Sequence, residues 1–135
     1  MTDVELIEKA KEAARASYSP YSGFTVGAAL ITKDGKLYLG CNIESASYSP
    51  TCCAERTAFF KAVSDGERQF SKIAIVGGKG LDFKDFSPPC GVCRQVLSEL
   101  LNQDTPIILS IGTEVEIYTI AELLPVQFNS EDLVK

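Results

Sequence analysis

Residues 72–78, KIAIVGG, form the segment that decides the fold. Between Lys72 and the two glycines the segment is apolar throughout. Such a run predicts a short strand that is buried on both faces. A strand of this kind lies inside a sheet that carries helices on both sides, so the segments around it should contain helices.

Helices are predicted on either side of this strand along the chain. Residues 53–64, CAERTAFFKAVS, are rich in helix formers, and Gly66 is a natural stop just beyond them. Residues 87–102, SPPCGVCRQVLSELLN, place Pro89 where a first-turn proline belongs. The apolar positions of this second helix share one core-facing side, at Val92, Val96, Leu97, Leu100 and Leu101.

A third helix is predicted over residues 2–18, at the start of the sequence. Thr2 can cap this helix, and Glu5 can reach back to complete a capping box. Pro20 and Gly23 then break the helical pattern. Its core-facing stripe consists of Val4, Ile7, Ala10, Ala14 and Tyr18.

Two predicted hairpins supply the remaining strands. Residues 24–32 and 36–43 flank a Lys-Asp-Gly turn. Residues 106–111 and 114–120 flank a Gly-Thr turn, and a short helical turn, AELLP, follows before the tail. We therefore predict an α/β fold in which a mixed sheet carries helices on both faces, as one domain over residues 1–135.

The composition limits the partners that the protein can have. The 135 residues are 45% hydrophobic and 23% charged, which suits one folded core without disulfide bridges. A net charge of −5 and the lack of a basic cluster argue against nucleic acid as a partner. Because no run of 18 apolar residues occurs and the first residues are charged, we expect a cytoplasmic protein that does not enter membranes.

Metal or proton chemistry must use residues other than histidine, because the sequence contains none. Five cysteines in a reducing compartment indicate metal binding or catalysis more than a disulfide framework. Cys53 begins one predicted helix, and Cys90 and Cys93 begin another. Helix N-termini favour thiolates, and three thiolates on Zn²⁺ leave one position open for water, as in a catalytic zinc site.

Two other interpretations of these cysteines stay open. Recruitment of Cys41 or Cys52 as a fourth ligand would make the site a structural zinc site and the protein a binding module. Alternatively, Cys90 and Cys93 could form a redox pair without any metal.

Charged residues next to the cysteines complete the candidate site. Alone, Glu55 would be interpreted as a first-turn residue that offsets the helix dipole, but beside three ligand-type cysteines it becomes a candidate proton carrier. Arg56 and Arg94 each follow one of these motifs. They are surface ion-pair partners or donors of hydrogen bonds to the thiolates.

Motifs along most of the chain resemble the cytidine deaminase family, in its short-chain, homotetrameric form that acts on free nucleosides. The spacing of a Cys ligand, one residue, Glu and a later PCxxC is that of zinc-dependent deaminases. The matching segments are YSPYSGFTVGAAL, GCNIESASY, CAERTA, PCGVCRQ and ELLPVQF, at residues 18–30, 40–48, 53–58, 89–95 and 122–128. The resemblance implies a three-layer α-β-α fold with a mixed five-stranded sheet.

The resemblance also implies a reaction and a set of site residues. Zn²⁺, one per subunit, would be held by Cys53, Cys90 and Cys93, and Glu55 would shuttle protons. The implied reaction is hydrolytic deamination of cytidine and 2′-deoxycytidine in pyrimidine salvage, with attack of zinc-bound hydroxide on C4 and release of ammonia. Substrate contacts are implied for Phe24, Asn42, Glu44 and Ala54, and contacts across subunits for Tyr48 and Phe128.

Alternatives and departures qualify these assignments. Without the resemblance, Phe24 would be a core aromatic, and Asn42 and Glu44 would be strand-end or solvent-facing polar groups. Blasticidin-type deaminases share the zinc motif and are the second candidate class. The sequence departs from the family pattern at Ser45, Ser49 and Val92, which affects loop geometry and the fit of the pocket.

Overall fold

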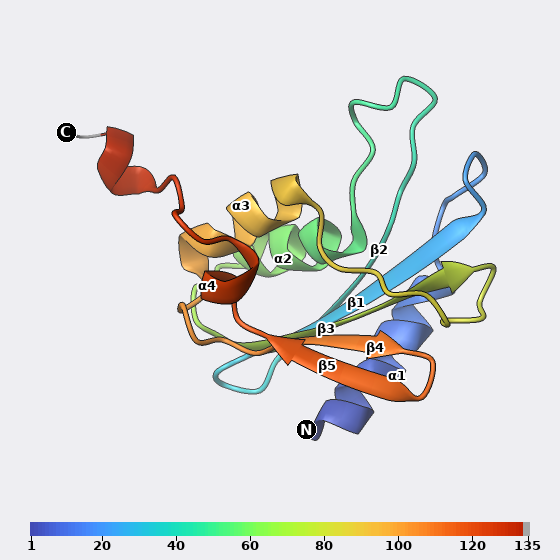
Figure 1. The fold of residues 1–135 in the computed structure, drawn as a ribbon, viewed down its shortest axis with the longest axis horizontal. Coiled ribbons are helices and arrows are strands. Elements are labelled where there is room, and N and C mark those ends of the chain that lie inside the picture. Colours follow the sequence, from blue (N-terminus) through green and yellow to red (C-terminus); the bar gives the residue numbers. More distant parts are fainter. Residues whose placement is uncertain (134–135) are drawn as a thin grey trace.

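The computed structural model describes residues 1–133 as a three-layer molecule, with a five-stranded sheet between layers of helices (Figure 1). The strands lie in the order β2-β1-β3-β4-β5. Their bounds are Phe24–Thr32 for β1, Leu37–Cys41 for β2, Phe70–Lys79 for β3, Ile107–Ile111 for β4 and Glu114–Tyr118 for β5. The predicted α/β class and the mixed, helix-flanked sheet are confirmed.

Strand β3 is the centre of the sheet. It pairs antiparallel with β1 on one side and parallel with β4 on the other. The outer pairs, β1–β2 and β4–β5, are antiparallel and correspond to the two predicted hairpins. Residues 73–78 of β3 are buried, as the run KIAIVGG predicts for a strand covered on both faces.

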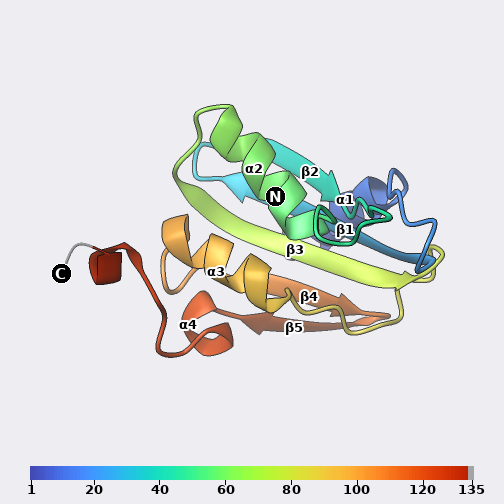
Figure 2. The ribbon, with the colours of Figure 1, turned by 90° about the horizontal axis from the view of Figure 1, so that it is seen from above.

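Helices cover the two faces unequally, and Figure 2 shows the two layers. Helix α1 (Asp3–Ala14) packs on one face, while α2 (Ala54–Ser64) and α3 (Gly91–Leu100) pack on the other. Alternate residues of β3 serve the two layers, because side chains of a strand point to opposite faces. Ile73 and Ile75 join the core beneath α2 and α3, whereas Ala74 and Val76 join the core beneath α1.

Two glycines let helices approach the sheet closely, one on each face. A Cβ on Gly27 would lie 1.9 Å from the backbone oxygen of Ala10 in α1. A Cβ on Gly40 would lie 2.4 Å from the backbone nitrogen of Ala58 in α2. Neither position can carry a side chain unless its helix moves. Gly40 matters for the site, because α2 begins next to the candidate ligand Cys53.

The N-terminal helix is shorter than predicted. The capping box of Thr2 and Glu5 is present, but α1 ends at Ala14 and Val4 is exposed. Beyond this end, the backbone N–H of Tyr18 donates to the oxygen of Asn42, and Tyr18 forms a bridge with Ile43 instead of continuing the helix. The predicted stripe is therefore wrong at both of its ends. The buried positions of the helix are Leu6, Ile7, Ala10, Ala13 and Ala14.

The boundaries of α3 and β5 also differ from the prediction. Helix α3 begins at Gly91 with Cys90 as its N-cap, so Pro89 precedes the helix, and Val92 is exposed. Strand β5 stops at Tyr118 because Thr119 caps the short helix α4 (Ile120–Leu123). The 3₁₀ helix η1 (Ser130–Leu133) lies in what the sequence suggested was tail. Within residues 1–133, no helix has the length and apolar character required to cross a bilayer.

Candidate metal centre and active site

Three free cysteines meet where two helices begin. Cys53 is the N-cap of α2, Cys90 is the N-cap of α3, and Cys93 lies in the first turn of α3. The Cys90 Sγ lies 3.6 Å from the Cys53 Sγ and 3.5 Å from the Cys93 Sγ. All three sulfur atoms lie within 4.8 Å of one another. The sequence predicted this set, and the fold brings its members together from segments about 40 residues apart along the chain.

The spacing and chemistry of these thiols fit a zinc ion. Sulfur ligands about 2.3 Å from a tetrahedral Zn²⁺ lie roughly 3.8 Å from one another, close to the separations found here. The N-termini of α2 and α3 supply partial positive charge to the thiolates. Three sulfur ligands leave one tetrahedral position for a further ligand, which is the arrangement of catalytic zinc.

Hydrogen bonds already favour an ionised thiol in this cluster. A hydrogen bond from the Cys93 thiol, helped by Arg56, lowers the pKa of Cys53 to about 5. The same shared proton, together with burial, raises the pKa of Cys93. The three thiols would have to give up this shared proton to hold a zinc ion, because metal ligation requires thiolates.

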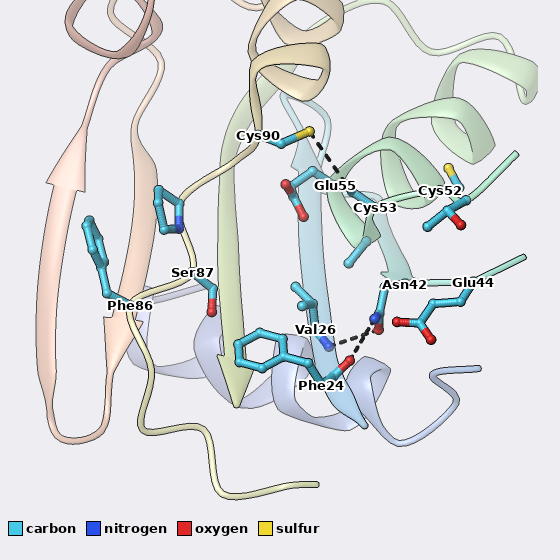
Figure 3. A pocket seen from close by; sticks show the side chains of 13 residues that line it. Phe24, Val26, Asn42, Glu44, Cys52, Cys53, Glu55, Phe86, Ser87 and Cys90 are labelled. Carbon is cyan, nitrogen blue, oxygen red and sulfur yellow. Dashed lines mark hydrogen bonds between the residues drawn. The ribbon is translucent and has the colours of Figure 1, made fainter. Parts of the chain in front are cut away.

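Glu55 lies in the first turn of α2, two residues after Cys53, and its side chain faces the thiols (Figure 3). Only 3% of the residue is exposed. Burial raises the pKa of its carboxyl group to about 7, with a smaller contribution from the Cys53 thiolate. A carboxyl group with a pKa close to neutrality can both accept and return a proton, as a general base and acid must.

The two candidate arginines differ in what they contact. The Arg56 Nη2 donates to the backbone oxygen of Thr51, at 3.2 Å, and lies 3.7 Å from the Cys53 Sγ. Its Nε is buried without a hydrogen-bond partner among residues 1–133. Arg56 therefore lies where it can offset thiolate charge.

The expectation that Arg94 also contacts a thiolate needs correction. The Arg94 Nε donates to the oxygen of Pro89 at 2.8 Å, and its Nη1 donates to the oxygen of Leu123 at 2.7 Å. The guanidinium thus joins the loop before α3 to the end of α4. It braces the loop that carries Cys90, because two of its nitrogen atoms donate to backbone carbonyls.

A pocket with a volume of about 360 Å³ opens beside the thiols. Its thiol end consists of Cys53, Glu55 and Cys90, together with Ala54. Its polar end consists of Phe24, Asn42 and Glu44, and comes from β1 and the segment after β2 (Figure 3). The volume lies in the range of pockets that hold small molecules.

Asn42 is largely committed to the fold. Its Nδ2 donates to the oxygen of Phe24 at 2.8 Å, and its Oδ1 accepts from the Val26 N–H at 2.9 Å and from the Ser17 hydroxyl at 2.5 Å. Both acceptor positions of the amide are therefore used, and one N–H remains for a ligand.

Glu44 is fixed by the loop that precedes β1. Its carboxylate accepts from the backbone N–H of Tyr21 at 3.0 Å and of Ser22 at 3.1 Å, and it also accepts from the Ser22 hydroxyl. The hydrogen bonds from Ser22 lower the pKa of Glu44. The pocket consequently has an ionised acceptor at its polar end.

Tyr48 and Phe128, the residues implied to act across subunits, lie outside the main pocket. Tyr48 is 77% exposed in the loop between β2 and α2, where it lines a second hollow beside Glu44. Phe128 is 56% exposed in the segment after α4, and its backbone oxygen accepts from the Gln95 side chain at 2.8 Å. Figure 1 shows both segments projecting from the body of the molecule.

Five residues that line the pocket were not predicted as site residues from the sequence, and two of them, Val26 and Pro88, are aliphatic. Thr51, Phe86 and Ser87 line the pocket. Phe86 and Ser87 come from the loop between β3 and α3, which has no periodic pattern to reveal where its side chains point. Cys52 also lines the pocket, where its sulfur accepts a hydrogen bond from the Thr57 hydroxyl at 3.6 Å, so it is not simply packed as an apolar residue.

Comparisons with known proteins agree with this geometry. The family described as "Cytidine and deoxycytidylate deaminase zinc-binding region" matches residues 1–108. A cytidine deaminase of Sporosarcina psychrophila is 51% identical over 133 residues, which cover 97% of this chain and 95% of that protein. One of Halalkalibacterium halodurans is 49% identical over 129 residues, covering 95% of each chain. The crystal structure of cytidine deaminase from Burkholderia pseudomallei has a TM-score of 0.88 and 45% identity, covering 95% of this chain and all of that one.

A three-thiol zinc site with a buried carboxyl group, at the N-termini of two helices on a mixed sheet, defines a zinc-dependent hydrolase of the deaminase type. Given the matches above, the chain belongs to the cytidine deaminase family.

Proposed function

We propose that this protein hydrolyses cytidine and 2′-deoxycytidine to uridine and 2′-deoxyuridine with release of ammonia. The observation that carries the proposal is the position of Glu55, a buried carboxyl group with a pKa near neutrality, in one pocket with the metal-binding thiols. The names of the similar proteins support cytidine as the substrate.

The residues divide the chemistry between them. Cys53, Cys90 and Cys93 would hold Zn²⁺. When bound, the ion would lower the pKa of a water ligand to about 7. Glu55 accepts a proton from the attacking water and delivers it to ring N3 of the pyrimidine while the water oxygen bonds to C4. It then assists transfer of the second water proton to the amino group, which leaves as ammonia when the C4–N bond breaks. Because the pKa of Glu55 is raised to about 7, the same group can perform both transfers near neutral pH. Arg56 offsets the negative charge of the thiolates.

The polar end of the pocket suits a nucleoside. The free N–H of Asn42 and the carboxylate of Glu44 can hydrogen-bond the ribose hydroxyls, and Phe24 offers an apolar contact for the pyrimidine. The backbone around Ala54 would orient the base. An ionised Glu44 would repel a 5′-phosphate, so free nucleosides should be preferred to nucleotides and nucleic acid.

A homotetramer with pockets shared between subunits is part of the proposal. The exposure of the aromatic rings of Tyr48 and Phe128, on two projecting segments, supports it. Analytical ultracentrifugation of the purified protein should give four times the mass of the chain. A fully active monomer would contradict the shared pocket.

We further propose that residues 1–135 act as one deaminase domain, in the cytoplasm, within pyrimidine salvage. The match of the family to residues 1–108 and the single sheet that runs from β2 to β5 support the one-domain assignment. The cellular assignment follows from the acidic, globular composition and from the proposed reaction.

Loss of ultraviolet absorbance on conversion of cytidine to uridine tests the reaction directly. Cytidine and 2′-deoxycytidine should be converted, and a zinc chelator should abolish turnover until zinc is restored. Guanine, adenosine, cytidine 5′-monophosphate and blasticidin S serve as comparison substrates. Efficient turnover of blasticidin S without cytidine turnover would favour the second class of deaminase, and chelator-resistant turnover would contradict the zinc-dependent reaction.

A further inference from the structure

We propose that Ser17 is a positioning residue, which holds the side-chain amide of Asn42 so that it offers the pocket a hydrogen-bond donor and no acceptor. This inference deepens the proposed function and rests on it, because it concerns how the polar end of the same pocket binds a sugar. The observation that carries it is the hydrogen bond from the Ser17 hydroxyl to the Asn42 Oδ1, at 2.5 Å.

The orientation of the Asn42 amide follows from its partners in β1. The backbone N–H of Val26 can only donate, so the amide atom that faces it at 2.9 Å must be the oxygen. The backbone oxygen of Phe24 can only accept, so the amide atom that faces it at 2.8 Å must be the nitrogen. These two bonds, drawn in Figure 3, decide which way round the amide lies.

Ser17 supplies the contact that β1 does not. With the bonds to β1 alone, one lone pair of the Asn42 Oδ1 would stay open, and the amide would present both a donor and an acceptor. The Ser17 hydroxyl also lies 3.0 Å from the Ser19 hydroxyl, but it has a single hydrogen, and the shorter contact assigns that hydrogen to Asn42. The second lone pair is thereby filled, and the group left for a ligand is one N–H of the Nδ2.

Backbone hydrogen bonds hold the segment of Ser17 against the segment of Asn42. The N–H of Ser17 donates to the oxygen of Ala14, at the end of α1, at 3.1 Å. The N–H of Tyr18 donates to the oxygen of Asn42 at 3.1 Å, and the N–H of Glu44 donates to the oxygen of Tyr18 at 2.8 Å. The fold therefore places the Ser17 hydroxyl before any ligand binds, which limits the entropy lost on binding.

A fixed donor and a fixed acceptor in one pocket specify what the polar end recognises. Asn42 offers an N–H, and the ionised carboxylate of Glu44 accepts. Sugar hydroxyls meet both demands, because each hydroxyl accepts and donates. Proton transfer belongs to Glu55, at the other end of the pocket. Loss of the Ser17 hydroxyl should consequently weaken substrate binding more than it slows the chemical step.

Kinetics of Ser17→Ala, compared with Ser71→Ala, give the first test. Ser71 is an exposed serine near the start of β3 and lies outside the pocket, so its substitution removes a hydroxyl that has no part in binding. Ser17→Ala should raise the KM for cytidine about fivefold, as expected for loss of one hydrogen bond, and should change kcat less than about twofold. Ser71→Ala should change neither. An unchanged KM in Ser17→Ala would overturn the inference.

Inhibition by two product analogues tests whether the effect passes through the sugar. Uridine has the hydroxyls that Asn42 can contact, whereas 2′,3′-dideoxyuridine lacks both of them. Ser17→Ala should raise the inhibition constant of uridine about fivefold and leave that of 2′,3′-dideoxyuridine unchanged. A general loosening of the pocket would weaken both inhibitors equally, and that result would overturn the inference.

A matched pair of variants separates the hydroxyl from the bulk of the side chain. Ser17→Thr and Ser17→Val add side chains of the same shape, and only the first keeps a hydroxyl. Ser17→Thr should bind uridine more tightly than Ser17→Val, by about fivefold. Equal inhibition constants would show that the hydroxyl has no positioning role. This pair also carries the test if thermal unfolding shows that Ser17→Ala does not fold.

These tests separate the two proposals. If the unmodified protein does not convert cytidine, the proposed function fails, irrespective of any variant. If it converts cytidine and Ser17→Ala behaves as Ser71→Ala does, the proposed function stands and the role of Ser17 fails.

Discussion

The two ends of the pocket are built in different ways. The thiol end places Cys53, Glu55 and Cys90 at the beginnings of two helices that pack on the sheet. The polar end takes its side chains from strand β1 and from the segment after β2. There Glu44 is held by backbone N–H groups of the loop that precedes β1. One end is therefore fixed by the core, and the other by local hydrogen bonds.

This difference assigns different tasks to the two ends. Helix N-termini supply a fixed electrostatic field for thiolates, and burial adjusts the proton affinity of a carboxyl group. Loop-borne groups can change without disturbing the core, which suits them to substrate selection. We therefore expect changes at the thiol end to abolish the chemistry or the metal site, and changes at the polar end to alter KM and substrate preference.

The largest effect on turnover without loss of metal is expected for Glu55→Gln. The amide has nearly the same size but cannot carry the proton, so kcat should fall by about 10²–10⁴-fold while zinc stays bound. Measured rates should be compared with those of Glu99→Gln, an exposed glutamate of α3, which should be as active as the unmodified protein. Substantial turnover in Glu55→Gln would show that the proton travels by another route.

The raised pKa of Glu55 predicts a pH-dependent stability of the zinc-free protein. Burial raises this pKa from 4.5 to about 7, so between these values the folded state binds a proton that the unfolded chain does not. The free energy of unfolding should fall by about 3 kcal/mol as the pH rises through this range, relative to Glu55→Gln. Urea titrations of the chelated proteins at several pH values measure this difference. Parallel pH profiles for the two proteins would contradict the raised pKa.

Two glycine substitutions, one on each face of the sheet, test whether the metal site depends on the position of α2. Gly40→Ala pushes against α2, and Gly27→Ala pushes against α1. Each should lower the free energy of unfolding by about 1–3 kcal/mol. Because α2 carries Cys53 and Glu55, Gly40→Ala should also weaken zinc binding, whereas Gly27→Ala should not. Equal zinc affinities in the two variants would show that the metal site does not depend on the position of α2.

At the polar end, Glu44→Gln should have the smallest effect of this series. Loss of the ionised acceptor should raise the KM for cytidine about tenfold and leave kcat nearly unchanged. The preference for cytidine over cytidine 5′-monophosphate should also decrease, because the repulsion of the phosphate is removed. Glu114→Gln, on β5, is the control. If Glu44→Gln lowers kcat as strongly as Glu55→Gln, the proposed division of the pocket is wrong.

The sequence predicted the thiol end well because its signals are local. The spacing of Cys53 and Glu55, and of Cys90 and Cys93, places each pair across the N-cap and first turn of a helix. Burial of the run KIAIVGG on both faces of the sheet follows from its apolar composition in the same way. What the sequence could not supply was the distance between the two helix ends, which depends on sheet order.

The polar end was harder to predict because its contacts are tertiary. The side-chain amide of Asn42 forms hydrogen bonds with Phe24, Val26 and Ser17. Nothing in the sequence around Asn42 indicates these partners. Arg94 binds backbone carbonyls that are brought near it by α4.

The central claim is that three thiols, and not four, hold the metal. The most direct test is the zinc content of the purified protein and of five single Cys→Ser variants, measured by inductively coupled plasma mass spectrometry. The predicted result is one zinc per chain in the unmodified protein, Cys41→Ser and Cys52→Ser, with loss of zinc and turnover in Cys53→Ser, Cys90→Ser and Cys93→Ser. Loss of zinc in four of the variants would show a four-thiolate structural site, and a zinc-free active protein would contradict the metal centre altogether.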